Sequence, residues 1–365
     1  VVRGGGAPRR TMTALHQFLP SLAPRDAIGA HTLAVRAVLR DHGIESEIFA
    51  GEVHRDLQRE ARSYKEFRGG VPMLYHSAIG CALGDWIRDR SEDLVLDYHN
   101  ITPPEYFEHW APETALLLAQ GRSQLARLAP RATMGLADST YNAVELDHFG
   151  CARTSVVPVF VDPGEWGALD DTERDRLMSS KRGADWLFVG RLAANKAHHD
   201  LICAFALYRR AWDPHARLWL VGGSSSGPYQ LALEALVARL GLSDAVVITG
   251  SVPSGTLGAY FASADVFVCV SEHEGFCVPL IEAMWWGVPV VAHGVAAIPE
   301  TVGDAAVLLP DKDFATVAAA VDRVVRDHRL RDSLIARGRE RVEHYAPART
   351  AQTLIDAVRA AGIGA

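Results

Sequence analysis

The sequence predicts an α/β protein built from two Rossmann-like domains that face one cleft. Short apolar segments alternate with helical segments along the chain, which is the pattern of parallel βαβ units. The alternation breaks between residues 160 and 181, where Pro163, Gly164 and a charged run over 170–182 interrupt it, and then it resumes. The length of 365 residues fits two domains, each of about 100–200 residues.

The first series of elements predicts an N-terminal domain over residues 11–163. Residues 1–10 contain glycine and arginine but no apolar stretch, so we expect a flexible arm and no signal peptide. A loop with Pro20 and Gly29 leads into a helix expected from about Ala30 to His42, which Gly43 ends. The expected strands cover residues 12–18, 44–49, 73–76, 93–98, 133–137 and 154–158.

The second series predicts a C-terminal domain over residues 183–346. We expect residues 164–182 to form a linker that includes a charged helix. After the domain, Pro347 opens an alanine-rich segment, which predicts a helix over 347–365. The expected strands cover residues 186–189, 216–221, 245–249, 266–270, 289–292 and 306–309.

Composition excludes several classes of protein. A net charge of -7 argues against a dedicated nucleic-acid binder. The five cysteines form no Cys-x-x-Cys pair and lie mostly in apolar runs, which is typical of reduced thiols in a cytoplasmic protein. No apolar run approaches the roughly 20 residues that span a bilayer. Residues 52–70 mix both signs of charge, so we expect at most peripheral membrane contact.

The most informative segment runs from Ser271 to Pro289. It follows an apolar run over 264–270 that predicts a buried strand, and it contains a short polar loop and a helix that ends at Gly287. Glu274 therefore lies at the carboxyl edge of a strand, and Glu282 lies on the helix that the loop opens. Ligands bind at this edge of open α/β sheets, where a helix N-terminus suits a phosphate and carboxylates accept sugar hydroxyls.

A second motif ends a predicted strand at Gly190 and places Arg191 and Lys196 directly after it. A diphosphate is an anion, and cleavage of a bond to it adds charge to the leaving oxygen. Fixed cations stabilise that charge without a metal. An arginine clamps phosphate through two hydrogen bonds, and a lysine adds a point charge. The pair therefore predicts a diphosphate site.

Together these motifs resemble the signature of retaining nucleotide-sugar glycosyltransferases of the GT-B fold, family 4. The resemblance rests on Glu-Gly-Phe-x-x-Pro-x-x-Glu-Ala over 274–283, Gly-Val-Pro-Val-Val over 287–291, and Val-Gly-Arg-Leu over 189–192 with Lys196. It implies that a hexose or related sugar moves from a nucleoside-diphosphate sugar to a hydroxyl of an acceptor. The acceptor is a small molecule, glycan or glycolipid held by the N-terminal domain. The helix over 347–365 is implied to cross back to that domain.

The resemblance also implies roles for individual residues. Glu274 faces the hydroxyls of the transferred sugar, and Glu282 binds the ribose. His99 lies close to the donor sugar, where it bonds a hydroxyl or supports the transition state through its neighbouring backbone. The implied catalytic residues are Glu274, His99, Arg191 and Lys196. The implied donor-binding residues are Gly29, Gly190, Arg191, Lys196, Val252, Glu274, Gly275, Phe276, Cys277, Val278 and Glu282.

The chain departs from the family pattern at three places. Cys277 stands where glycine is common, which narrows the sugar pocket. A single glycine, Gly29, precedes the first helix where the family has a glycine-rich loop. Val159 and Phe160 replace an Asn-Gly pair before the linker.

No cofactor and no metal are expected, because Arg191 and Lys196 supply fixed cations and the chain has no convincing Asp-x-Asp loop. The resemblance implies that the departing phosphate itself accepts the acceptor's proton, so no dedicated base is expected. Two alternatives remain open: a catalytically inactive scaffold that binds nucleotide sugar, and a GT-B nucleotide-sugar epimerase. A nicotinamide dehydrogenase is disfavoured, because the Gly-x-Gly-x-x-Gly fingerprint is missing. The donor's base and sugar, the acceptor and the oligomeric state are not indicated.

Overall fold

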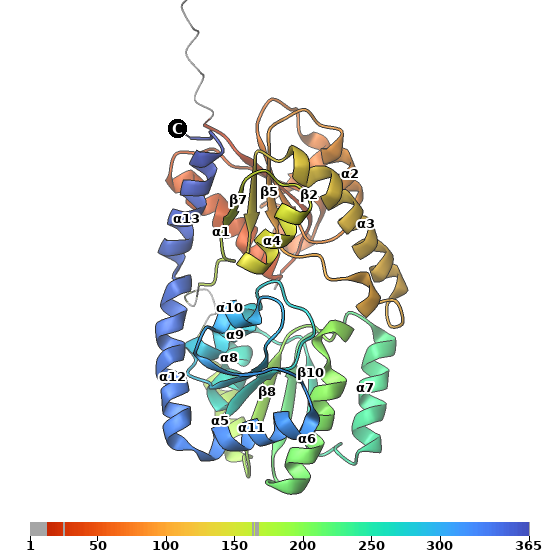
Figure 1. Cartoon of the computed structure of the whole chain (residues 1–365), viewed down its shortest axis with the longest axis vertical. Coiled ribbons are helices and arrows are strands. Elements are labelled where there is room, and N and C mark those ends of the chain that lie inside the picture. Colours follow the sequence, from red (N-terminus) through yellow and green to blue (C-terminus); the bar gives the residue numbers. More distant parts are fainter. Residues whose placement is uncertain (1–12, 25, 163, 165–167, 365) are drawn as a thin grey trace, which may run out of the picture.

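The computed structural model describes residues 13–24, 26–162, 164 and 168–364. The chain folds into two lobes stacked along its longest axis, each with helices packed around a parallel sheet (Figure 1). This arrangement confirms the predicted α/β class with two Rossmann-like domains.

The N-terminal sheet contains, within the described residues, seven parallel strands in the order β3-β2-β1-β4-β5-β6-β7. Its strands are β1 His16–Leu22, β2 Ile48–Val53, β3 Arg62–Ser63, β4 Met73–Ser77, β5 Leu94–Tyr98, β6 Met134–Ala137 and β7 Thr154–Val156. Its helices are α1 Ala27–Asp41, α2 Ala82–Arg88, α3 Pro112–Leu128 and α4 Thr140–His148.

The C-terminal sheet has six parallel strands among the described residues, in the order β10-β9-β8-β11-β12-β13. Its strands are β8 Asp185–Val189, β9 Arg217–Val221, β10 Val246–Gly250, β11 Val266–Cys269, β12 Val290–His293 and β13 Ala306–Leu309. Its helices are α5 Asp171–Ser179, α6 His198–Ala211, α7 Gly227–Arg239, α8 Ser254–Ser263, α9 Val278–Trp285, α10 Ile298–Val302, α11 Phe314–Arg326 and α12 His328–Val342; the last helix, α13 Pro347–Ala360, follows them.

The first two strands lie about four residues later than the sequence pattern predicts. Ile44 belongs to no strand: its N–H donates to the carbonyl of Leu39 at 2.9 Å, and its side chain is buried below the end of α1. The apolar run therefore closes the helix, and strand pairing aligns Gln17 with Ile48. The expected loop at Pro20 is also wrong, since Pro20 lies within β1.

Two segments outside the sheets connect the lobes. Helix α5 falls in the expected linker, yet it packs on α8 and buries Leu177 in the C-terminal core. Helix α13 leaves α12 and lies along the N-terminal lobe, where it packs against α1 and β6 (Figure 1). Leu354 and Val358 of α13 are buried there with Val35 and Leu39 of α1. The flexible arm expected over residues 1–10 lies outside the described residues.

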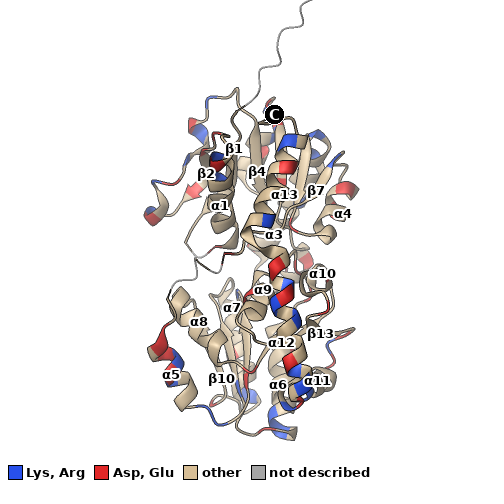
Figure 2. Ribbon diagram, turned by 90° about the vertical axis from the view of Figure 1, so that its left-hand side faces the viewer, with Lys and Arg blue, Asp and Glu red and all other residues tan. Residues whose placement is uncertain are grey.

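Charged residues of both signs occur along α5, α12 and α13 (Figure 2). Across the described parts of the chain, none of the helices combines the length and apolar character needed to cross a bilayer.

Candidate active site

The candidate site lies at the carboxyl edge of the C-terminal sheet, on the side that faces the N-terminal domain. The loop over 271–277, between β11 and α9, carries Glu274. A one-turn 3-10 helix, Ala194–Lys196, follows β8 and carries Lys196. Asn195 joins the two loops: its amide nitrogen donates to the carbonyl of His273 at 3.2 Å, and its carbonyl accepts from the N–H of Glu272 at 2.8 Å.

The structure brings Glu274 and Lys196 into an ion pair. Lys196 Nζ lies 2.5 Å from Glu274 Oε2, although the residues are 78 positions apart. The Glu274 side chain is 7% exposed and that of Lys196 is 21% exposed. Burial lowers the pKa of Lys196, but the Glu274 carboxylate outweighs burial and raises that pKa above its ordinary value. Lys196 is therefore charged at neutral pH.

Helix α9 begins with a strained residue. Cys277 is its N-cap and has a φ of 72°, a conformation that favours glycine. This explains in physical terms why a glycine is common at this position in the family that the motif resembles. Phe276 is buried, and its carbonyl accepts from the Thr301 hydroxyl at 2.6 Å, which holds the loop from behind. Val278 and Pro279 then open the helix.

Glu282 lies one turn into α9 and is partly exposed. Among the described residues, its carboxylate has neither a hydrogen-bond donor nor a cation beside it. Burial raises the pKa of Glu282 to about 7. A desolvated carboxylate without a protein partner suits the hydroxyls of a ligand.

Arg191 reaches toward the N-terminal domain. Its side chain is 67% exposed, and one guanidinium nitrogen lies 3.9 Å from Asp26 Oδ1. Gly190, just before it, has a φ of 153°, and its carbonyl oxygen would lie 2.0 Å from a Cβ on Gly222. The loops after β8 and β9 therefore touch through backbone. Val252, in the loop after β10, is half-buried and packs against the hydrophobic core of the C-terminal domain.

The expected position of Gly29 before the first helix is wrong. Helix α1 starts at Ala27, so Gly29 lies inside its first turn. Asp26 caps the helix, and its carboxylate accepts from the N–H of Gly29 at 3.0 Å. That N–H is therefore already satisfied, which weakens the case for a diphosphate contact at Gly29. The signal for this cap was an aspartate three residues before the glycine.

His99 follows β5, and both of its ring nitrogens already have protein partners. Nδ1 donates to the Asp138 carboxylate at 3.0 and 3.1 Å, and Nε2 lies 3.0 Å from Nδ1 of His76. Burial lowers the pKa of His99, but Asp138 and Asp97 outweigh it and raise the pKa to about 9. Burial lowers the pKa of His76 to about 4. His99 is therefore the charged ring and His76 the neutral one, and both face Asp97, whose Oδ2 lies 3.1 Å from His76 Nδ1 and 3.5 Å from His99 Nε2.

Sequence reasoning missed Asp138 and His76. Asp138 is the first residue after β6, and the available signal was a polar residue directly after an apolar strand. His76 lies within β4, and its Nε2 donates to Gln17 Oε1 at 2.9 Å. A histidine inside an apolar strand offers no comparable signal.

Two clusters among the described residues bring metal-binding atoms within 4.8 Å of one another: His31, His76, Asp97 and His99, and Cys269, Glu274 and Cys277. In the first cluster, the N–H of Phe160 donates to His31 Nδ1 at 3.1 Å, so the ring's proton is on Nε2, which faces Asp97 at 3.1 Å. His31 therefore offers no free lone pair. In the second cluster, the ammonium of Lys196 already neutralises Glu274. These hydrogen bonds and charges disfavour both as metal sites.

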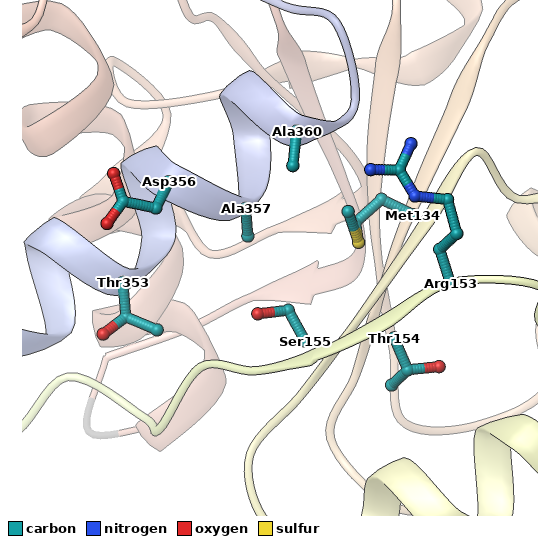
Figure 3. Close-up of a pocket in the computed structure, with 8 residues that line it drawn as sticks. All are labelled: Met134, Arg153, Thr154, Ser155, Thr353, Asp356, Ala357 and Ala360. Carbon is teal, nitrogen blue, oxygen red and sulfur yellow. The ribbon is translucent and has the colours of Figure 1, made fainter.

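A surface hollow of about 530 Å³ lies where α13 meets β6 and β7 (Figure 3). It is lined by Met134, Arg153, Thr154, Ser155, Thr353, Asp356, Ala357 and Ala360. None of the candidate site residues lines it, so it is separate from the site described above.

Two Rossmann-like lobes, each built on a parallel sheet, with the candidate site between them, are the arrangement of the GT-B fold of glycosyltransferases. Sucrose-phosphate synthase from Thermosynechococcus elongatus superposes with a TM-score of 0.75 and 18% identity, over 95% of this chain and 98% of that chain. HepE of Anabaena, solved in complex with UDP-glucose, superposes with a TM-score of 0.71 and 18% identity, over 94% of this chain and 99% of that chain. These likenesses establish the fold.

Residues 170–341, in the C-terminal domain, match the family model described as glycosyl transferases group 1. D-inositol 3-phosphate glycosyltransferase of Geodermatophilus obscurus is 34% identical over 254 residues, which cover 66% of this chain and 55% of that protein. 2-deoxystreptamine glucosyltransferase of Streptomyces kanamyceticus is 34% identical over 221 residues, covering 58% of this chain and 55% of that protein. The alignment thus spans about half the length of these relatives.

Proposed function

We propose that this protein is a retaining, metal-independent glycosyltransferase that moves a sugar from a nucleoside-diphosphate sugar to a hydroxyl of an acceptor. The observation that carries the proposal is the buried Lys196–Glu274 pair at the carboxyl edge of β8 and β11. The family model that matches residues 170–341 and the names of the similar proteins support the reaction class.

In this proposal, Arg191 and Lys196 stabilise the diphosphate as it leaves. Arg191 is exposed enough to turn from Asp26 toward a ligand. Lys196 is held near the site by Glu274, so its charge is in place before the bond breaks, and preorganised charge needs no reorganisation in the transition state. The departing phosphate oxygen accepts the proton of the acceptor hydroxyl, and the new bond forms on the face from which the old one leaves.

The two glutamates divide the donor between them. Glu282, which lacks a protein partner among the described residues, accepts the ribose hydroxyls. Glu274 accepts hydroxyls of the transferred sugar while it keeps Lys196 in position. The backbone N–H groups of Phe276, Cys277 and Val278 approach the diphosphate and sugar, and Val252 lies beside the base.

His99 supports the sugar through its backbone in this proposal, because its two ring nitrogens are engaged by Asp138 and His76. The N-terminal domain holds the acceptor. The alternatives, an inactive scaffold or an epimerase, have less support: the charged pair expected of a transferase is present, and no added acid–base pair was found in the sequence to serve an epimerase.

The test is a thermal-shift panel of UDP-, GDP-, ADP- and dTDP-sugars without metal. One donor should stabilise the protein, by about 2.7 kcal/mol at a concentration 100 times its dissociation constant. Glu282→Ala should abolish most of that shift. An inactive scaffold would show the same shift but no donor turnover. No shift with any donor would contradict the proposal.

A further inference from the structure

The N-terminal domain forms hydrogen bonds to the 271–277 loop on both sides of Glu274. Asn100 Oδ1 accepts from Nε2 of His273 at 2.6 Å, and the Ser139 hydroxyl donates to the carbonyl of Gly275 at 2.8 Å. The residues immediately before and after Glu274 are therefore both bonded to the other domain. Residue 274 itself is bonded within its own domain, where its carbonyl accepts from the N–H of Ala297 at 3.2 Å.

The two domains meet here at contact distance. A Cβ on Gly275 would lie 2.5 Å from Cβ of Asn100 and 3.2 Å from the amide nitrogen of Asn142. Asn100 has a φ of 65°, which asparagine tolerates better than most residues. Its amide nitrogen donates to Asn142 Oδ1 at 2.9 Å, so its oxygen faces His273. The amide is thus oriented to accept from the 271–277 loop.

Asn100 and Ser139, which bond to the loop, each directly follow a member of a buried ion pair. His99 precedes Asn100, and Asp138 precedes Ser139. The side chains of His99 and Asp138 are 2% and 4% exposed and lie 3.0 Å apart. The pair therefore ties the loop after β5 to the turn before α4.

A third contact strengthens the same junction at its rim. The Glu300 carboxylate accepts from the N–H of Thr140 at 2.8 and 2.9 Å and from its hydroxyl at 2.8 Å. Glu300 lies on α10 of the C-terminal domain, and Thr140 opens α4. A carboxylate at a helix N-terminus is favourable, so α4 is a docking point for the other domain.

We propose that the His99–Asp138 pair is the support of an inter-domain clamp, formed by Asn100 and Ser139, that sets the orientation of Glu274 when the domains close. His99 and Asp138 are positioning residues in this proposal, and their side chains do not touch the substrate. Only the expected effect on turnover rests on the proposed function. The contacts of Asn100 and Ser139 with the 271–277 loop can be tested without substrate.

The first test is hydrogen–deuterium exchange of the ligand-free protein. Asn100→Gly removes both amide bonds while glycine accepts the φ of 65°. Asp138→Asn keeps the shape of the side chain and removes its charge. Both variants should speed exchange of the peptide covering 271–277, with β4 and β5 unchanged in Asn100→Gly. Wild-type exchange of that peptide in both variants would overturn the proposal.

The second test separates positioning from binding. The dissociation constant of the nucleotide, which Arg191 and Glu282 hold, should stay within about twofold of wild type in the variants. The kcat should fall roughly 10²-fold, the loss of rate expected when a catalytic group is misplaced. Asn100→Asp, which keeps an acceptor for His273 and tolerates the same φ, should recover part of kcat. Unchanged kcat in Asn100→Gly would overturn the proposal. A wild-type protein that turns over no donor would contradict the proposed function, while the exchange result would still decide the clamp.

Discussion

At the scale of single residues, the decisive group is Lys196, whose ammonium is paired with Glu274 at 2.5 Å. Lys196→Ala should lower the transfer rate by roughly 10²–10³-fold, the loss that follows removal of one electrostatic stabiliser. Lys196→Arg should recover part of the rate, because a planar guanidinium replaces a compact ammonium poorly. Steady-state kinetics with the donor chosen by thermal shift measures both.

The chain offers a matched control for this variant. Lys181 forms an ion pair with Asp265 at 2.7 Å, and the two side chains are 20% and 17% exposed. Lys181→Ala therefore also removes a largely buried pair, and both variants should lower the melting temperature. Only Lys196→Ala should lose the transfer rate. Equal rates in the two variants would remove Lys196 from the mechanism.

The raised pKa of Glu282 indicates how donor affinity should depend on pH. Burial raises its pKa to about 7, so the carboxyl is largely protonated at pH 6 and largely ionised at pH 8. The ionised form accepts the ribose hydroxyls, so donor affinity should rise with pH, by about tenfold between pH 6 and 8 for one group titrating near 7. Titration calorimetry with the intact nucleotide sugar measures this. Glu282→Gln should show a flat profile, and the same slope in that variant would contradict the assignment.

At the scale of elements, the 271–277 loop can contact the N-terminal domain because Gly275 has no side chain at the point of closest approach. Gly275→Ala would place a methyl group 2.5 Å from Cβ of Asn100, so the domains must separate. We expect the transfer rate to fall by roughly 10²-fold. Gly227→Ala is the control, since a Cβ there meets nothing within 4 Å and the rate should not change. A wild-type rate for Gly275→Ala would show that this contact is not needed for turnover.

The sequence indicated individual elements well where pattern and local chemistry agree. The loop and helix around Glu274 follow directly from an apolar strand, a polar loop and Gly287 as the stop. The errors arose where a local side chain changed the boundary. Asp26 caps α1 early, and Ile44 closes the end of that helix and does not enter a strand.

At the scale of the whole molecule, the alternation of strands and helices was sufficient to predict two Rossmann-like lobes. The contacts between the lobes were not predictable, because they join residues far apart in sequence. Asn100 and His273 are 173 positions apart, and each looks like an ordinary loop residue until the domains are placed together. Within the N-terminal domain, the pairing of the His99 ring with Asp138, 39 positions away, was likewise not predictable.

The most direct test of the account is proton NMR of donor turnover in EDTA, with the nucleotide sugar selected by thermal shift and water or an added hydroxyl compound as acceptor. The donor should be consumed with the chelator present, and the first product should carry the donor's anomeric configuration. Lys196→Ala should nearly abolish consumption. An inverted product, or turnover that stops in EDTA and returns with magnesium or manganese, would contradict it.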